Sequence, residues 1–308
     1  MRKLRLEPQH PFYFRARACM RREAPQIAHC WSFTDGLAAA RGPRRHTAIL
    51  QLNGAPVPAA YYRRWPPDRW IIREAIAGAD VRIVCSEFVR GLIAHYYGQD
   101  CRVMFPAFDV DEFPKGPGPA DGRPVILAIG DFTLRRKGAR PLVRAFDLVR
   151  RKAPDAVLRL SGRSSDALQR ELLESVPAAT RERIEFLGLG KPEDVPAQYR
   201  AASVMALPSM WEPSGGVLIE SWASGTPVVA TRHGGLPEFV GEGVGVLFDP
   251  RSDSEEVQNV EGLAEALLAG LDLAQRPGIR DACREHAERF SWRTLGPDLE
   301  RLYEEVCP

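Results

Sequence analysis

Two carboxylates eight residues apart bracket a glycine-rich turn in the second half of the chain. Glu212 precedes the sequence Pro-Ser-Gly-Gly, and Glu220 follows it inside an apolar run. This pattern predicts a loop followed by a helix start, where the backbone N–H groups of Ser214, Gly215 and Gly216 would bind an anion. Glu212 would flank that anion and Glu220 would reach a diol. The alternative is an ordinary helix start that carries glutamate to balance the helix dipole.

A second chemical motif is the basic loop at 130–138, which follows a short apolar run at 124–130. Lys137 supplies a point charge suited to phosphate, and Arg136 adds a second cation. A fixed ammonium beside a helix start stabilises charge that develops on a departing phosphate. The alternative is a solvated basic loop with no ligand.

Two further patterns each leave two interpretations open. Asp109 and Asp111 form a D-x-D pair, which binds a cation in some enzymes, but their place at a domain crossover favours a structural role. His29 at a strand end is the candidate for an acceptor-side base, or it is a structural histidine.

The elements that must position these residues alternate regularly in the second half. We predict strands at 124–130, 156–160, 184–187, 204–207, 227–230 and 244–248, with helices at 139–152, 166–176, 193–202 and 215–223. A short turn is expected at 234–238, and a helical tail at 254–306 broken near Pro277 and Pro297. Such alternation predicts a parallel sheet covered on both faces.

The first half is less regular. Strands are predicted at 27–30, 47–52, 81–85 and 102–105, with one helix at 87–97 and proline-rich turns between them. The basic stretch 1–25 is interpreted as a solvated arm, or as a contact for an anionic membrane surface or a phosphorylated acceptor. An aromatic cluster in this half comprises Tyr61, Tyr62, Trp65 and Trp70. It either packs under its loop or stacks on a bound sugar ring.

Composition sets the limits of the interpretation. With 308 residues, 44% apolar, the chain is long enough for two domains with sizeable cores. A net charge of +2 gives no argument for nucleic acid. The six cysteines form no C-x-x-C pair, which favours a reduced, cytoplasmic chain. No apolar run approaches the length of a membrane span, and no signal-peptide core is present.

The carboxylate pattern E-x7-E, with Ala-Ser-Gly-Thr-Pro-Val-Val-Ala after it, resembles the donor-binding signature of retaining glycosyltransferases of the GT-B fold, family 4. The loop Gly-Asp-Phe-Thr-Leu-Arg-Arg-Lys-Gly resembles the phosphate loop of that family, and Gly-Gly-Leu-Pro-Glu at 234–238 and Phe-Ser-Trp at 290–292 match other family motifs. The resemblance covers about residues 26–306.

The resemblance implies an α/β GT-B fold with two Rossmann-like parallel-sheet domains that face a central cleft. The expected domains are an abbreviated N-terminal acceptor-side domain at 1–114, a linker at 115–123 and a donor domain at 124–290. A C-terminal helix at 291–308 would pack back towards the N-terminal domain. The N-terminal domain is called abbreviated because the opening strand and Gly-Gly loop of the family are not found.

The implied function is transfer of a sugar, with retention, from a nucleotide-sugar donor, UDP-sugar first, to a hydroxyl of a sugar, lipid-linked or small-molecule acceptor. Arg136 and Lys137 would hold the phosphates, and Glu220 the ribose. The backbone at 214–216 would cradle the pyrophosphate, Glu212 would orient the sugar, and His29 would act on the acceptor. No metal, cofactor, nucleic acid or protein nucleophile is expected, and the location would be cytoplasmic or peripheral at the inner membrane face.

The chain also departs from the family pattern. Ser214 replaces an aromatic residue, Asn53 replaces a histidine, and Asp131 stands where the family has a phosphate-binding arginine, so Arg136 or Arg232 would supply that charge. These departures leave a non-catalytic nucleotide-sugar binder or partner subunit as the alternative. A different enzyme on the same fold, such as an epimerase or phosphorylase, is disfavoured by the E-x7-E spacing.

Overall fold

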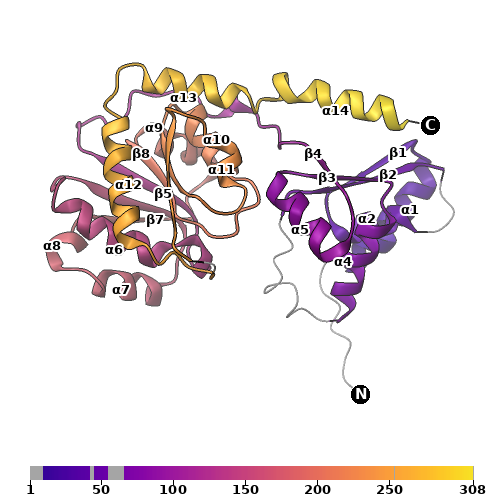
Figure 1. The fold of residues 1–308 in the computed structure, drawn as a ribbon, viewed down its shortest axis with the longest axis horizontal. Coiled ribbons are helices and arrows are strands. Elements are labelled where there is room, and N and C mark those ends of the chain that lie inside the picture. The colour runs from indigo at the N-terminus through magenta and orange to yellow at the C-terminus, as the bar shows by residue number, and fades with distance from the viewer. Residues whose placement is uncertain (1–9, 42–44, 55–65, 253, 308) are drawn as a thin grey trace. The chain divides into compact units, whose positions relative to one another are not determined.

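The structure is a computed structural model that describes residues 10–41, 45–54, 66–252 and 254–307. The chain divides into two compact units, Met1–Pro106 with Gly296–Pro308, and Ala107–Leu295. Each unit contains one parallel β-sheet with helices against it (Figure 1). The two sheets confirm the expected α/β class with two parallel-sheet domains.

The first unit has a four-stranded sheet in the order β1-β2-β3-β4. All neighbouring strands are parallel, with Ile27 opposite Thr47 and Ile49 opposite Val81. The strands confirm the four predicted positions and are β1 (Ile27–Cys30), β2 (Thr47–Leu52), β3 (Val81–Val84) and β4 (Arg102–Val103). The predicted helix at 87–97 is α5 (Glu87–Tyr97), which Ser86 caps.

Among the described residues of the first unit, three helices differ from the prediction. The prediction of a solvated arm at 1–25 is wrong for α1 (His10–Glu23), which packs on α2 (Phe33–Ala40). A capping box of Ser32 and Asp35 starts α2. The paired prolines at 66 and 67 were interpreted as a turn, yet they begin α4 (Pro66–Gly78). Proline is compatible with a first helical turn because the N–H groups there lack intrahelical partners.

The end of the last helix, α14 (Trp292–Val306), belongs to the first unit from Gly296 onward. Leu302 is buried beside Ile49 and Ile83 of the sheet. The Thr47 hydroxyl donates to the carbonyl oxygen of Val306 at 2.8 Å. This helix end therefore completes one face of the first sheet.

The second unit has a six-stranded parallel sheet in the order β10-β9-β8-β5-β6-β7. Its strands confirm the predicted positions and are β5 (Val125–Asp131), β6 (Val157–Arg163), β7 (Ile184–Gly188), β8 (Val204–Leu207), β9 (Val228–Thr231) and β10 (Gly245–Phe248). β5 pairs with both β6 and β8, so the order reverses beside it. Ligands of such sheets bind at the carboxyl ends of strands near this reversal.

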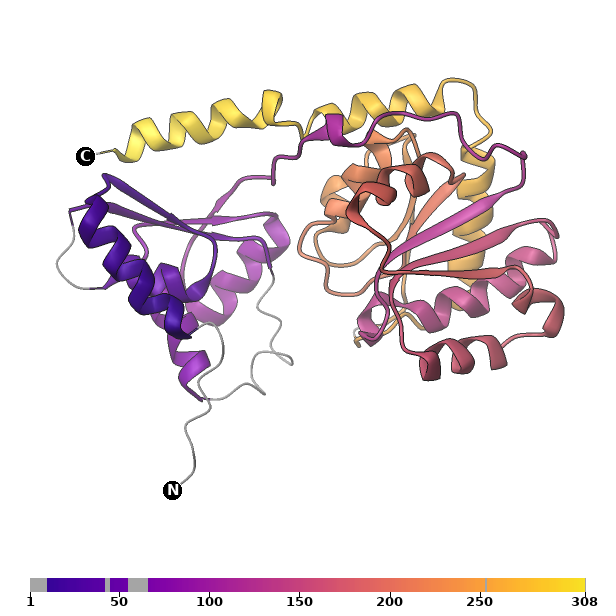
Figure 2. The same ribbon diagram turned by 180° about the vertical axis from the view of Figure 1, so that it is seen from behind.

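Helices cover both faces of this sheet, as Figure 1 and the reverse view in Figure 2 show. On one face α6 (Ala139–Arg150) packs against α12 (Val260–Leu273). On the other, α10 (Gly216–Ala223) packs against α13 (Ile279–Glu288) and α9 (Val195–Arg200). The short helices α7 (Asp166–Glu174), α8 (Ala178–Arg181) and α11 (Leu236–Phe239) complete the unit.

The helical tail is interrupted near Pro277, as predicted, but the predicted break near Pro297 is wrong. Pro297 lies inside α14, and the interruption comes earlier, at Ser291. There the backbone of Phe108 accepts from the N–H of Trp292 and donates to Phe290. These bonds replace intrahelical bonds, which explains the break.

The stretch 115–123, expected to be a linker, has neither helix nor strand and lies within the second unit. The division between the units falls upstream of it, at 106/107. Gly116 donates to the carbonyl oxygen of Ser224 at 3.2 Å, and Lys115 pairs with Asp281. The structure thus fixes this stretch to the helices of the second unit.

Candidate functional site

Two cations and one carboxylate meet at the carboxyl end of β5 and β8. The Nζ atom of Lys137 lies 2.5 Å from Oε1 of Glu212, and Nη1 of Arg136 lies 3.1 Å from the same oxygen. The Glu212 side chain is 11% exposed and that of Lys137 is 18% exposed. Residues about 75 positions apart in sequence therefore form one largely buried charge cluster.

Backbone contacts fix this cluster. Gly138 has a φ of +70°, and a Cβ atom there would lie 2.2 Å from the carbonyl oxygen of Pro208. The N–H of Met210 donates to the carbonyl oxygen of Arg136 at 2.8 Å. The loop that carries the two cations is therefore docked on the loop that carries Glu212. Glycine is required at 138 both for its backbone conformation and for this close approach.

A third loop holds the backbone of Glu212. The N–H of Gly235 donates to its carbonyl oxygen at 2.8 Å, and a Cβ atom at Gly234 would lie 2.5 Å from the same oxygen. The preceding residue, Trp211, has a φ of +60°, and its N–H donates to Nδ1 of His233 at 3.2 Å. The turn predicted at 234–238 is only partly present, because the chain forms a turn at 234–235 and then helix α11, and this segment holds the backbone of Glu212. No sequence pattern indicated the part played by Trp211 or His233.

The helix start expected at 215 is present. No side chain caps α10, and Gly215 has a φ of +138°. A Cβ atom at Gly216 would lie 2.9 Å from the ring of Phe108. Ser214 is half-buried beside these glycines. The backbone of the helix start therefore has no capping side chain that would compete with an anion.

Glu220 lies on the first turns of α10 and is held by a tyrosine. The Tyr199 hydroxyl donates to Oε2 of Glu220 at 2.8 Å, and Tyr199 is fully buried. Burial raises the pKa of the Glu220 carboxyl above its ordinary value, and the Tyr199 hydrogen bond partly opposes that rise. Sequence reasoning missed Tyr199, although it falls on the buried face of the helix predicted at 193–202.

For the nucleotide binding that the sequence predicts, Tyr199→Phe should weaken the affinity about three- to tenfold at neutral pH, because Glu220 loses the donor that orients it. The hydroxyl favours the ionised carboxylate, so its removal raises the pKa of Glu220 further. An ionised carboxylate accepts hydrogen bonds from a diol more strongly than a protonated carboxyl does. Affinity should therefore fall as the pH drops towards the raised pKa of Glu220, and the fall should begin at a higher pH in the variant.

Calorimetric titration of the nucleotide against pH measures both effects, with Tyr96→Phe in the first unit as the matched control. The raised pKa of Glu220 also makes its contribution to the unfolding free energy decrease as the pH rises. Equal pH profiles for the wild type and Tyr199→Phe would contradict the assigned role of Tyr199.

The carboxylate of Asp131 forms hydrogen bonds with Thr133, two residues further along the chain. It accepts hydrogen bonds from the N–H of Thr133 at 3.1 Å and from the hydroxyl of Thr133 at 2.5 Å. These bonds, the hydroxyl first, lower the pKa of Asp131. Arg136 faces Glu212, and Arg232 is exposed. The hypothesis that one of these arginines replaces the missing family arginine stays a prediction.

The D-x-D pair has structural partners. Asp109 accepts from the N–H of Asp111 at the start of a short 3-10 helix. The Asp111 carboxylate pairs with Arg284 and Arg293, each at 2.7 Å. Within the ranges that the structure describes, no three or more metal-ligating side chains gather at one point.

His29 lies in the first unit, at the end of β1. Its Nδ1 atom is 2.7 Å from the hydroxyl of Tyr303, and its ring stacks on Trp31. Burial lowers the pKa of His29, so the neutral imidazole is favoured. Among the described residues its buried Nε2 atom meets no partner at hydrogen-bond geometry, although the Gln51 side chain partly opposes the lowering of the pKa. The acceptor-side role of His29 stays a prediction.

The aromatic cluster predicted in this unit is largely outside the described residues. Tyr61, Tyr62 and Trp65 all fall there. Trp70 lies on α4, about half exposed, with the guanidinium of Arg41 4.4 Å from its ring centroid.

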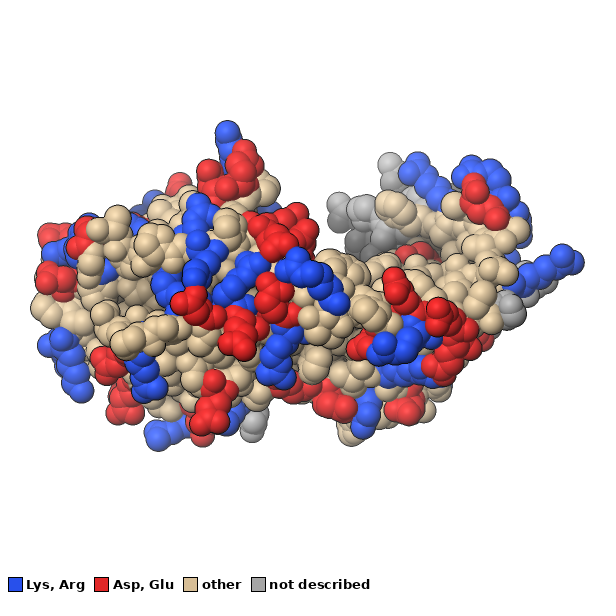
Figure 3. Space-filling model, turned by 90° about the horizontal axis from the view of Figure 1, so that it is seen from above, with Lys and Arg blue, Asp and Glu red and all other residues tan. Residues whose placement is uncertain are grey.

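The surface and the helices carry two further observations. In Figure 3 acidic and basic side chains are interspersed over the face shown, with no single-sign field. Among the residues whose structure is described, no helix has both the length and the apolar character needed to cross a membrane.

The second unit thus combines a parallel sheet, a basic loop, an uncapped glycine helix start and two carboxylates eight residues apart. Comparison with known proteins identifies the family. A family model described as glycosyl transferases group 1 matches residues 123–271, and one described as glycosyltransferase family 4 matches residues 2–112. The chain belongs to the family 4 glycosyltransferases.

Several relatives carry curated names. The D-inositol 3-phosphate glycosyltransferase of Corynebacterium kroppenstedtii is 31% identical over 290 residues, which is 86% of this chain and 62% of that protein. The α-maltose-1-phosphate synthase of Mycolicibacterium smegmatis is 29% identical over 337 residues, 92% of this chain and 80% of that protein. The chain thus spans about 62% of the length of the first of these relatives.

Solved structures share the fold. Sucrose-phosphate synthase from Thermosynechococcus elongatus matches with a TM-score of 0.78 at 22% identity, over 99% of this chain and 80% of that one. Anabaena HepE in complex with UDP matches with a TM-score of 0.76 at 19% identity, over 96% and 82%. These similarities confirm the expected GT-B fold.

Proposed function

We propose that the chain transfers a sugar from a nucleotide-sugar donor, a UDP-sugar first, to an acceptor hydroxyl, with retention at the anomeric carbon. The observation that carries this proposal is the convergence of Lys137 and Arg136 on Glu212, beside the uncapped start of α10. Glu220 lies further along the same helix, where it suits a ribose diol. The UDP complex of the structural relative HepE supports the choice of nucleotide.

The reaction expels a nucleoside diphosphate, so negative charge grows on the leaving group. Lys137 and Arg136 stabilise that charge more in the transition state than in the ground state. Glu212 holds both cations in place before the donor arrives, so they need little reorganisation. With cations already supplied by the protein, the proposed reaction uses no divalent ion.

The sugar centre develops positive charge as the leaving group departs. Glu212 contacts the two cations that would bind the diphosphate, so it would lie next to the bond that breaks. Its carboxylate is proposed to orient the sugar and to stabilise the positive charge at the sugar centre. The acceptor approaches the face from which the diphosphate leaves and passes its proton to the departing phosphate oxygen. The proposed acceptor is a hydroxyl group of a sugar, of a lipid-linked molecule or of another small molecule. His29 is the residue proposed to act on that acceptor.

The function is tested by titrating the protein with UDP, GDP, ADP and their sugar conjugates while following thermal stability and binding heat. We expect one nucleotide class to bind, and Glu220→Gln to weaken it roughly tenfold or more because the charged acceptor of the diol is lost. Glu242→Gln, an exposed carboxylate of the same unit, is the control. Transfer is then followed by NMR of the anomeric proton, with and without chelator.

The outcomes separate the proposals. A retained anomeric configuration, unchanged in chelator, supports the full proposal, and an inverted product or a loss in chelator contradicts it. Binding without transfer to any acceptor favours the second candidate, a nucleotide-sugar binder or partner subunit. Asp131, at a position where the family has a phosphate-binding arginine, is the observation that favours that second candidate. No binding of any nucleotide overturns both.

A further inference from the structure

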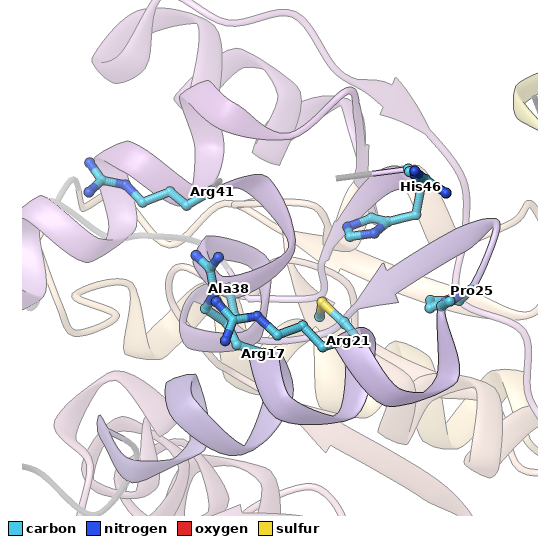
Figure 4. A pocket seen from close by; sticks show the side chains of 9 residues that line it. Arg17, Arg21, Pro25, Ala38, Arg41 and His46 are labelled. Carbon is cyan, nitrogen blue, oxygen red and sulfur yellow. The ribbon is translucent and has the colours of Figure 1, made fainter. Parts of the chain in front are cut away.

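The first unit contains a cavity of about 230 Å³ between α1, α2 and the strand starts at β1 and β2 (Figure 4). Two of its lining residues lie just before those strands: Pro25 is two residues before Ile27, and His46 directly precedes Thr47. The cavity therefore lies at the amino ends of the strands, whereas donors and acceptors of such sheets bind at the carboxyl ends. Its lining is strongly basic and includes Arg17, Arg21, Arg41, Arg45 and His46.

Two arginine side chains of α1 point into the same space. Figure 4 shows the side chains of Arg17 and Arg21 extending side by side towards Ala38 of α2. Arg17 is held by the Tyr13 hydroxyl at 3.2 Å. In the part of the chain that the structure describes, Arg21 has no carboxylate partner. Two adjacent guanidinium groups without a carboxylate repel each other, and an anion between them removes that repulsion.

A histidine faces the same space. The Nε2 atom of His46 lies 3.1 Å from the carbonyl oxygen of Ala39, which orients the ring, and Figure 4 shows the ring pointing into the cavity. Arg41 differs, because it extends away to its ion pair with Glu74 and its stacking on Trp70. The groups left for a ligand are thus the guanidinium groups of Arg17 and Arg21, with Arg45 and the His46 ring also in the lining.

The helix dipole explains one of the basic residues at the cavity without any ligand. Arg21 falls in the last turn of α1, where a basic side chain balances the helix dipole. Arg17 is a turn earlier, and Arg45 and His46 come from another segment, so the dipole does not account for their convergence. The cavity has room for several water-sized groups, which suits a phosphate with its oxygens.

We propose that this pocket binds a phosphate group, carried by a soluble phosphorylated molecule or by a lipid headgroup. Guanidinium groups match phosphate oxygens in geometry and charge. Phe12 and Phe14 of α1 are 57% and 74% exposed. If the phosphate belongs to a lipid, these apolar side chains on the same helix would contact its hydrocarbon part. The site is separate from the donor cluster of the second unit and does not depend on the proposed transferase activity.

The test uses the full chain and two probes. Inorganic phosphate is titrated by calorimetry at constant ionic strength, and co-sedimentation is measured with phosphatidylcholine vesicles that contain or lack phosphatidic acid. The double variant Arg17→Gln/Arg21→Gln removes the paired guanidinium groups. Arg15→Gln/Arg22→Gln on the same helix makes the same change in net charge outside the cavity lining and serves as the control.

We expect at least about tenfold weaker binding in the double variant and little change in the control, since each lost charged hydrogen bond costs roughly one order of magnitude. Loss for inorganic phosphate supports a soluble ligand, and loss only for phosphatidic acid vesicles supports a headgroup. No binding of either probe by the wild type, or equal losses in both double variants, overturns the proposal. Circular dichroism and thermal melting of each variant verify the fold independently.

Discussion

Lys137→Ala is expected to lower the rate of the proposed sugar transfer about 10²- to 10³-fold, because in that proposal the largely buried Lys137 ammonium stabilises the charge that develops on the leaving group. Lys137 lies 2.5 Å from Glu212, so the variant also leaves that carboxylate with Arg136 as its remaining charge partner. The loss should appear mainly in kcat, since the stabilised charge grows in the transition state. Steady-state kinetics with a saturating donor measures it.

Two companion variants separate charge from position. Lys137→Arg keeps the charge but spreads it over a planar fork, so we expect partial activity. Lys152→Ala removes an exposed lysine of the same unit and should leave kcat unchanged. A Lys137→Ala enzyme with wild-type kcat would remove Lys137 from the mechanism, whatever its effect on KM.

The second large effect concerns stability. Arg280→Ala is expected to lower the unfolding free energy of the second unit by on the order of 3 kcal/mol, because hydrogen bonds to a charged donor would be lost and buried oxygens left unpaired. The Arg280 guanidinium donates to the carbonyl oxygens of Arg200 and Ser224 and to the hydroxyl of Thr226, each at 3.2 Å. It also donates to the carbonyl oxygen of Gly116 at 2.5 Å.

Calorimetric melting measures this loss, which should lower Tm by roughly 6–12 °C for a unit of this size. Arg276→Ala, an exposed arginine between α12 and α13, is the control and should shift Tm little. Burial lowers the pKa of Arg280, yet guanidinium stays charged in this range, so the loss should not vary with pH near neutrality. An unchanged Tm in Arg280→Ala would show that the bound segments hold together without it.

The second unit could be predicted closely from its sequence. Its strands are short apolar runs separated by glycine and proline, and buried parallel strands produce that pattern. The first unit was harder to predict because its helices contain residues that are typical of turns. In α2, Gly36 marks close packing of the helix on a strand rather than a turn, because a Cβ atom added there would lie 2.8 Å from Leu50.

The candidate site was predicted in its parts but not in its geometry. The types and spacing of Glu212, Glu220 and Lys137 indicated the chemistry. No local rule indicates that a lysine in one βα-loop will meet a carboxylate about 75 residues later, because sheet order decides which loops are neighbours. Tyr199 was missed for the same reason, since its hydroxyl reaches Glu220 across two helices.

The left-handed backbone of Trp211 has a consequence for engineering. A bulky residue at a φ of +60° costs on the order of 1–3 kcal/mol, but the indole packs against the core of the second unit, and this packing offsets the strain. Glycine at this position would relieve the strain but would remove that packing and the hydrogen bond that the indole Nε1 donates to the carbonyl oxygen of Ser254 at 3.3 Å. It would also give the chain before Glu212 more freedom, so a relaxed backbone and a fixed direction of the Glu212 carboxylate exclude each other at this position.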